Sequence, residues 1–175
     1  MIREIENITS NILNDLNIKS PKDIDVKKIA KKLGVNIKPE DLVFDISGLF
    51  VLKDGKAYIR YNNSESNERQ RFTIAHELGH FILHKDSNSL FVDYNNNKEK
   101  VMFRNFDSST GEIKKEREAN AFAASLLMPN HFIRQEIKNA PDNDKDIVSY
   151  LAKKFRVSEQ AMNFRLANLG FVGLY

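Results

Sequence analysis

Three residues in the stretch 71–84 have the types and the spacing that metal chemistry requires. His76, Glu77 and His80 form an H-E-x-x-H pattern. Side chains four residues apart on a helix point the same way, so both imidazoles would reach one metal ion with Glu77 beside it. A zinc hydrolase needs this arrangement. The competing interpretation is a buried helix with two hydrogen-bonded histidines, because the pattern fixes only three positions.

The third ligand must come from elsewhere, because catalytic zinc usually takes three protein ligands and leaves the fourth position to water. His84 continues the spacing, but it lies about 12 Å along the helix axis from His76 at about 1.5 Å per residue. We expect it at the helix end, beside the ligands. A second predicted helix, 116–129, offers Glu116 and Glu118, which point about 200° apart. Only one of the two should face the metal. The alternative interpretation for each is a charged side chain exposed to solvent.

Two blocks of the sequence carry a family resemblance. They read RFTIAHELGHFILH at residues 71–84 and ExxANxFAAxLLMP at residues 116–129, with shorter matches ISGLF at 46–50 and VSxxAMxxRLxxLG at 157–170. Together they resemble the ImmA/IrrE family of metallopeptidases. In that family the first Glu of the second block is a metal ligand, so the resemblance implies Glu116 rather than Glu118.

The resemblance and zinc chemistry together specify a mechanism. His76, His80 and Glu116 would hold zinc, or manganese or another divalent ion, since an N,N,O ligand set accepts several. The ion would activate a water molecule. Glu77 would take a proton from that water as it attacks a peptide carbonyl, and pass it to the leaving amine. A further side chain often holds the oxyanion. The candidates are His84, Arg104 and His131, each with a surface or structural role as the alternative.

The resemblance also implies a substrate. Members of the family are site-specific peptidases that cleave a helix-turn-helix transcriptional repressor, often encoded beside them, and so switch on stress-response or mobile-element genes. We therefore expect a protein substrate of that kind. Two alternatives from other classes are a DNA-binding protein and an antitoxin-like regulatory protein whose metal site is structural or idle.

Composition bounds the class of protein. With 175 residues, of which 41% are hydrophobic, the chain suits one domain or one domain with a small appendage. Cysteine is absent, which excludes disulfides and thiolate metal sites. The charged N-terminus and the lack of a long apolar segment predict a cytoplasmic protein without membrane association. The net charge of +3, from 27 basic and 24 acidic residues, is too even to indicate nucleic-acid binding. No pattern specifies an oligomeric state.

A helix from about residue 65 to 83 is predicted to carry the H-E-x-x-H pattern. Apolar residues recur along it at spacings of three and four, and Ser64 and Ser66 can cap its N-terminus. Gly79 in its middle costs about 1 kcal/mol relative to alanine, so we expect another backbone to lie close there. The second helix would pack its small alanines against this one.

The segments before this helix predict two short helices and a small sheet. The helices are expected at about 2–16 and 25–33, and the strands at 35–38, 46–52 and 56–61, the last two joined in a hairpin at Lys53-Asp-Gly. The segment Ser47 to Phe50 is the candidate for an edge strand that binds substrate. Residues 85–111 are expected to form an irregular hairpin or a flap over the cleft.

Three helices are predicted after Pro129. Asn130 would cap the first, and residues 147–155 and 158–169 have helix-turn-helix proportions. The last helix would offer solvent one cation among its exposed residues, which are Glu159, Gln160, Asn163, Arg165 and Asn168. DNA binding is therefore disfavoured relative to packing on the peptidase or docking a partner. The predicted fold class is α+β: a mainly helical, zincin-like metallopeptidase domain at 1–140, with a small sheet before the H-E-x-x-H helix and a helical appendage at 141–175.

Overall fold

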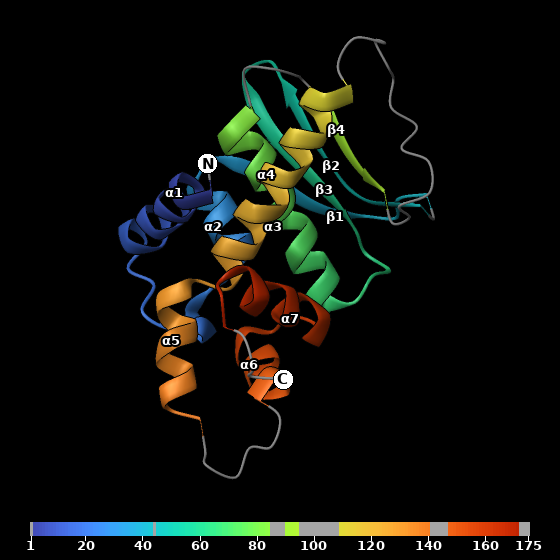
Figure 1. Ribbon diagram of the computed structural model, residues 1–175. Helices are drawn as coiled ribbons and strands as arrows, with labels where there is room; N and C mark the ends of the chain where they lie inside the picture. Colours follow the sequence, from blue (N-terminus) through green and yellow to red (C-terminus); the bar gives the residue numbers. More distant parts are fainter. Residues whose placement is uncertain (1, 44, 85–89, 95–108, 141–146, 172–175) are drawn as a thin grey trace.

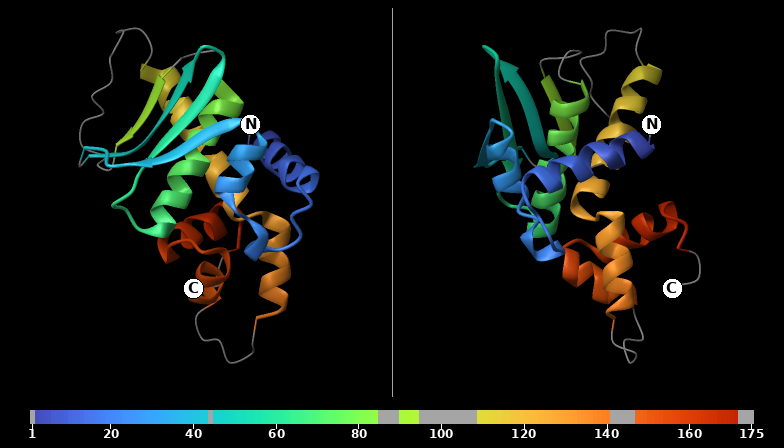
Figure 2. Two further views of the ribbon diagram at one scale, coloured as in Figure 1. Left: turned by 180° about the vertical axis from the view of Figure 1, so that it is seen from behind. Right: turned by 90° about the vertical axis from the view of Figure 1, so that its left-hand side faces the viewer.

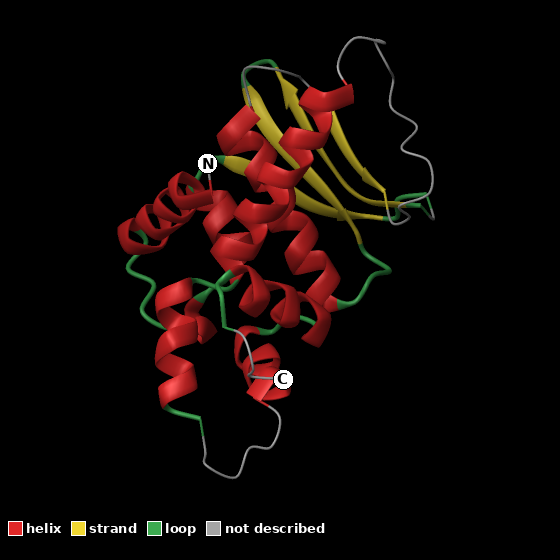
Figure 3. Cartoon of the chain, in the orientation of Figure 1, coloured by secondary structure: helices red, strands yellow, loops and turns green. Residues whose placement is uncertain are grey.

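The fold combines seven α-helices with a four-stranded sheet within the residues that the structure describes. The computed structural model describes residues 2–43, 45–84, 90–94, 109–140 and 147–171 (Figure 1). The helices are α1 (Ile2–Asp15), α2 (Val26–Lys32), α3 (Asn67–His84), α4 (Ser109–Leu127), α5 (Asn130–Lys138), α6 (Ile147–Phe155) and α7 (Glu159–Asn168), with a 3-10 turn η1 (Pro21–Asp23). The strands are β1 (Val35–Glu40), β2 (Ile46–Lys53), β3 (Lys56–Asn62) and β4 (Leu90–Tyr94). The predicted class, mainly helical α+β with a small sheet, is confirmed (Figure 3).

The sheet has the strand order β1-β3-β2-β4. β1 is parallel to β3, whereas β2 is antiparallel to both β3 and β4. The predicted hairpin joins β2 and β3, and Asp54 and Gly55 in its turn have φ values of 51° and 70°. Two positive φ values are what a two-residue type I′ hairpin requires, so this turn sets the register of the central strands.

The prediction that Ser47 to Phe50 form an edge strand is wrong. β4, which follows α3, pairs with β2 over these residues, with Gly48 opposite Asp93. β2 is therefore an interior strand, and β1 and β4 are the edges of the described sheet. The pairing depends on a segment that returns after a whole helix, which local patterning does not reveal. Of the predicted flap at 85–111, β4 and the first residues of α4 are described, and the rest lies outside the described residues.

Helix α3 lies between the sheet and α4. The side view in Figure 2 shows the strands on one side of α3 and α4 on the other. Phe50 of β2 contacts Phe81 of α3 with ring centroids 5.9 Å apart. On the far side, α4 packs against α1, where the hydroxyls of Thr9 and Ser125 lie 2.9 Å apart. The H-E-x-x-H helix is thus buried on two faces.

Gly79 allows α3 and α4 to approach closely, as predicted. A Cβ atom at Gly79 would lie 3.0 Å from Ala119 Cα and 3.2 Å from Ala119 O. Ser66 caps α3, since its Oγ accepts a hydrogen bond from Arg69 N at 3.2 Å. α4 begins at Ser109, well before the predicted start at Glu116, so the helix also contains the charged residues that precede it.

The helices after Pro129 agree with prediction except at one cap. Ser158 caps α7, and its Oγ accepts from Ala161 N at 3.1 Å. The prediction that Asn130 caps α5 is wrong. Pro129 occupies the cap position with extended ψ (134°), and Asn130 is the first helical residue, where its Oδ1 accepts from Arg134 Nε at 3.0 Å.

Arg165 is buried, contrary to the prediction that it faces solvent. It is only 5% exposed, its Nη1 lies 2.6 Å from Glu6 Oε1, and its Nε donates to Met128 O at 2.9 Å. The carboxylate of Glu6 on α1 and the carbonyl of Met128 after α4 therefore bind this side chain in the interior. As a result, α7 exposes no cation. The division at residue 140 stays a prediction.

A pair of arginines joins the N-terminal half of α3 to α6. Arg71 donates to Ile24 O at 3.0 Å and to Phe155 O at 3.3 Å. Arg156, directly after α6, donates to the same Ile24 carbonyl at 2.9 Å. Burial, followed by the positive charge of Arg156, lowers the pKa of Arg71 to about 10, so the guanidinium stays charged at neutral pH. These bonds hold the C-terminal helices against the motif helix.

Candidate metal centre

Three side chains from two helices converge where α3 packs against α4. The Nε2 atoms of His76 and His80, one turn apart on α3, lie 3.1 Å from each other. Glu116 of α4 brings its carboxylate oxygens to 3.6 Å from His76 Nε2 and 3.3 Å from His80 Nε2. The possible ligand atoms all lie within 4.8 Å of one another. The structure therefore brings together the three residues that the sequence proposes as ligands.

The chemistry of this cluster suits a divalent cation. His76 Nδ1 lies 3.0 Å from Asn120 Oδ1, an oxygen that accepts and does not donate, so the ring proton belongs on Nδ1. The Nε2 lone pair of His76 then faces the carboxylate of Glu116, and a cation would stabilise that arrangement. Two imidazoles on a tetrahedral zinc ion at about 2.1 Å have nitrogens roughly 3.4 Å apart. The separation of 3.1 Å between the His76 and His80 nitrogens is close to that value.

His76 is held in the neutral form that metal binding requires. Its ring is almost completely buried, and burial is the main cause that lowers its pKa from 6.5 to about 4. His80 and the guanidinium of Arg69 lower the pKa further, whereas Glu116 and the hydrogen bond with Asn120 raise it. A neutral imidazole keeps its lone pair at neutral pH, so His76 can bind a cation without first losing a proton.

Arg69 brings a positive charge toward the site, and the motif alone does not identify it. Its Nη2 donates to Ser47 Oγ at 2.8 Å, and its guanidinium carbon lies 6.0 Å from the ring centroid of Phe72. The Phe72 ring stacks in turn on His76, with centroids 6.3 Å apart. Arg69 precedes His76 by seven residues, a spacing that puts both on one helix face. That spacing is the signal by which it could be found.

Glu77 is fully buried, and the backbone of β2 lies against it. A Cβ atom at Gly48 would stand 2.3 Å from Thr73 Cγ2 and 3.7 Å from Glu77 Cγ. Only glycine lets the strand approach α3 this closely. The sequence signal for Gly48 is a glycine inside a strand pattern, which often marks close approach of another backbone.

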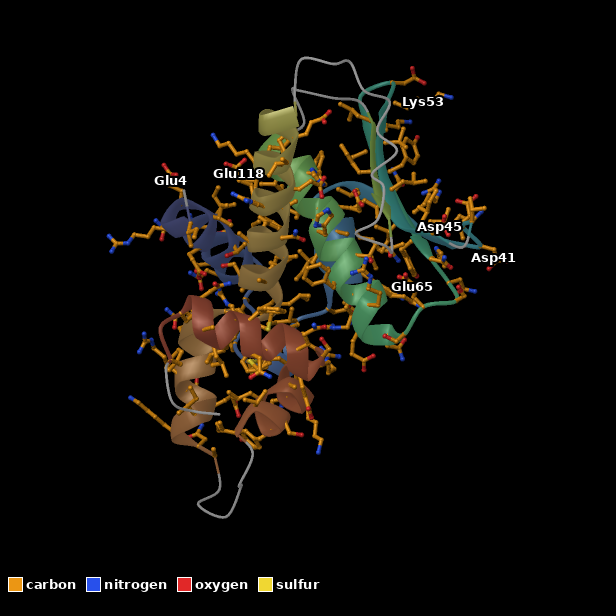
Figure 4. The ribbon with its side chains drawn as sticks, turned by 45° about the vertical axis from the view of Figure 1, so that its right-hand side comes forward. Glu4, Asp41, Asp45, Lys53, Glu65 and Glu118 are labelled. Carbon is orange, nitrogen blue, oxygen red and sulfur yellow. The ribbon has the colours of Figure 1, made fainter. Side chains whose placement is uncertain are left out.

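His84 stands at the last residue of α3 and contacts His80. Its Nδ1 lies 3.3 Å from His80 Nδ1, and its Nε2 lies 2.9 Å from Glu118 Oε2. Figure 4 labels Glu118 on the part of α4 that runs beside α3. Glu118 therefore contacts His84 and is not among the three residues whose ligand atoms converge.

The other two candidates for holding the oxyanion are not placed at this centre. Arg104 lies outside the described residues. His131 is exposed on α5, where its ring packs against Phe132 with centroids 4.0 Å apart. Partial burial lowers the pKa of His131, and Glu6 of α1 opposes that effect. The surroundings of His131 are thus on α1 and α5, and not on α3.

Comparison with known proteins gives consistent family and fold assignments. Residues 30–167 match the model of a peptidase family, M78, described as the IrrE N-terminal-like domain. Metallopeptidase ImmA of Bacillus subtilis (strain 168) is 27% identical over 158 residues, covering 83% of each chain. An uncharacterized immunity region protein 2 of Bacillus phage phi105 is 31% identical over 118 residues, covering 67% of each chain.

A solved structure shares the fold. It is a Mycobacterium tuberculosis transcriptional regulator with a TM-score of 0.63 and 15% sequence identity. The match covers 94% of this chain but 46% of that one, so this chain spans about half of its length. Among the described residues, no helix has the combination of length and apolar character that crossing a membrane requires.

Proposed function

The chain belongs to the M78 peptidase family of IrrE N-terminal-like domains, and from this premise we propose that it is a metal-dependent endopeptidase. The observation that carries the proposal is the convergence of two buried imidazoles and a carboxylate, from His76, His80 and Glu116. These residues would hold zinc, manganese or another divalent ion. A zinc ion held there supplies an activated water molecule and polarises the peptide carbonyl.

Glu77 is proposed as the general base. It follows the first proposed ligand directly on α3, and its side chain packs against the backbone of β2, where burial excludes bulk water. Its carboxylate would take the proton of the attacking water and return it to the leaving amine. Gly48 supports this role because it leaves room for the Glu77 side chain beside the strand.

The substrate backbone is proposed to add to the sheet at β4. Extended peptides bind exposed sheet edges through main-chain hydrogen bonds. β4 is the edge next to β2, and its residue Asp93 lies opposite Gly48, which in turn lies against Glu77. A peptide paired along β4 would therefore run two strand spacings, about 10 Å, from β2, on the side of the sheet edge nearest the proposed base.

The proposed substrate is a helix-turn-helix transcriptional repressor of a mobile element or a stress response. The family resemblance supports this class, as do relatives named metallopeptidase ImmA and immunity region protein. DNA binding by α7 is not favoured, since Arg165, the one cation expected on its surface, is buried against Glu6. The cytoplasmic location stays a prediction.

The test is cleavage of a small helix-turn-helix repressor, taken from a gene adjacent to that of this chain where one is encoded there. The two proteins are incubated with zinc or manganese, and any cut is mapped by mass spectrometry. The wild type should cut at one site, and Glu77→Gln should bind metal as tightly but lose cleavage. Glu112→Gln removes a carboxylate from the first turn of α4 and serves as the control that keeps activity. A fully active Glu77→Gln protein would refute the assignment.

A further inference from the structure

A chain of hydrogen bonds connects His80 to Glu118 through His84. Glu118 Oε2 lies 2.9 Å from His84 Nε2, and His84 Nδ1 lies 3.3 Å from His80 Nδ1. His80 is 1% exposed, His84 is 8% exposed, and the Glu118 side chain is 17% exposed. Because water has little access to these groups, the hydrogen bonds between them decide where each ring proton lies.

The carboxylate of Glu118, at one end of this series of hydrogen bonds, determines which ring nitrogen of each histidine carries the proton. A carboxylate accepts hydrogen bonds, so His84 donates to Glu118 from Nε2. The Nδ1 of a neutral His84 then accepts, and the Nδ1–H of His80 donates to it. This order leaves the lone pair of His80 on Nε2, the atom that lies 3.3 Å from Glu116 and 3.1 Å from His76 Nε2.

The second histidine of the centre is oriented by a different group on the same helix. Asn120 accepts a hydrogen bond from Nδ1–H of His76. The lone pair of His76, like that of His80, is therefore on Nε2. Helix α4 therefore brings the carboxylate of Glu116 to the centre and also provides Asn120 and Glu118 as supports. Glu118 reaches a different part of α3 because it lies on a different face of α4 from Glu116.

We propose that His84 and Glu118 are positioning residues that keep the proton of His80 on Nδ1 and direct its Nε2 toward the metal. Partners of this kind fix the tautomer and ring orientation of metal-binding histidines. The inference rests on the proposed function, since it takes His76, His80 and Glu116 to hold a metal ion. It gives the third histidine of the H-E-x-x-H-x-x-x-H series a role other than that of a ligand.

The first test compares two variants of nearly equal size at position 84. His84→Asn retains an oxygen that can accept from His80 Nδ1–H, whereas His84→Leu does not. Zinc affinity, measured by competition with a chromophoric chelator, should fall about 10- to 100-fold in His84→Leu. The loss in His84→Asn should be clearly smaller. Equal losses in the pair would contradict the inference, because they would indicate a packing role alone.

The second test reads the protons directly in the zinc-loaded protein. Nitrogen NMR of the histidine rings at neutral pH should show His80 protonated on Nδ1 and His84 on Nε2. In His84→Leu, the Nδ1–H signal of His80 should shift and exchange faster with solvent because its acceptor is lost, and Glu112→Gln should leave the spectrum unchanged. His80 protonated on Nε2 in the wild type overturns the inference. If only the proposed function fails, the tautomers and metal affinity will behave as described while no repressor is cut.

Discussion

Gly79 of α3 lies directly against the backbone of Ala119 of α4, so that a Cβ atom at Gly79 would stand 3.0 Å from Ala119 Cα. The same contact brings the histidines of α3 to the carboxylate of Glu116. The separation of the two helices therefore sets the dimensions of the candidate metal centre.

Gly79→Ala should destabilise the protein despite the better helix propensity of alanine. Propensity favours the substitution by about 1 kcal/mol, but the added methyl meets backbone atoms that cannot move alone, and overpacking costs about 1–3 kcal/mol. Metal affinity should fall as well, since α4 is pushed from α3. Urea unfolding and zinc titration measure the two effects.

Gly111→Ala is the matched control, because nothing lies within 4 Å of a Cβ atom there. Gly111 is also helical, in the first turn of α4. It should be neutral or stabilising by up to about 1 kcal/mol. Equal effects of the two substitutions would show that the close approach at Gly79 is unimportant.

Gly48→Ala should reduce peptidase activity more than metal binding. Its methyl would stand 2.3 Å from Thr73 Cγ2, so β2 must move away from α3 and from Glu77. The proposed ligands His76 and His80 do not lie in that contact. When both are measured on the same samples, the cleavage rate should fall by a larger factor than the zinc affinity.

Thr73→Ser removes the methyl group that clashes, so it should restore part of the activity and stability lost in Gly48→Ala. The double-mutant cycle should give a favourable coupling of about 0.5–3 kcal/mol. Recovery should be incomplete because Arg60 O still lies 3.1 Å from the added carbon. Simple additivity of the two substitutions would argue against a direct clash.

The metal-free protein should lose stability as the pH falls from about 6.5 to about 4. The unfolded chain takes up a proton on His76 near pH 6.5, whereas the folded protein does so only near pH 4. The unfolded state then binds more protons across this window, and the free energy of unfolding decreases with falling pH. A pKa lowered from 6.5 to about 4 corresponds to roughly 3 kcal/mol at about 1.4 kcal/mol per pH unit.

Urea unfolding in the presence of a chelator at several pH values measures this loss. The lowered pKa values of His84 and His131 act in the same direction. His76→Gln should flatten the pH dependence, since glutamine does not titrate. A slope as steep in the variant as in the wild type would assign the effect to other groups.

Arg165→Met should destabilise the protein by about 2–4 kcal/mol, because it leaves Glu6 and Met128 O without their buried partner. Glu6→Gln should cost less, as the Glu6 side chain is 23% exposed. A cycle of the two variants, followed by thermal unfolding, should show strong coupling. The exposed pair Lys28–Asp25 is the control and should show coupling near zero.

Local patterns in the sequence predict α3 well. The spacing of apolar residues, the Ser66 cap and the glycine in mid-helix depend on neighbours in the chain, and each is found in the structure. The pairing of Glu116 with the two histidines came from a family resemblance, because helical periodicity leaves Glu116 and Glu118 as alternatives.

Long-range contacts account for two of the predictions that are wrong. Arg165 is expected in solvent because of its charge, although it shares a helix face with buried Met162. Only the fold brings Glu6, from the other end of the chain, to its guanidinium. The edge assignment for β2 fails because β4 lies beyond α3 in sequence yet pairs with β2 in space. The clash that requires Gly48 is likewise visible only when Thr73 is packed against the strand.

The strand order has a consequence for how the centre opens. β3 precedes α3 in the chain and β4 follows it, and both strands belong to one sheet. The middle of α3 is covered by β2 on one side and by α4 on the other. Amides of residues 74–80 should therefore exchange with solvent only in the rare openings that disrupt the whole core, later than those of α2 or α6. The proposed ligands His76 and His80 thus lie in the part of the chain that is expected to unfold last.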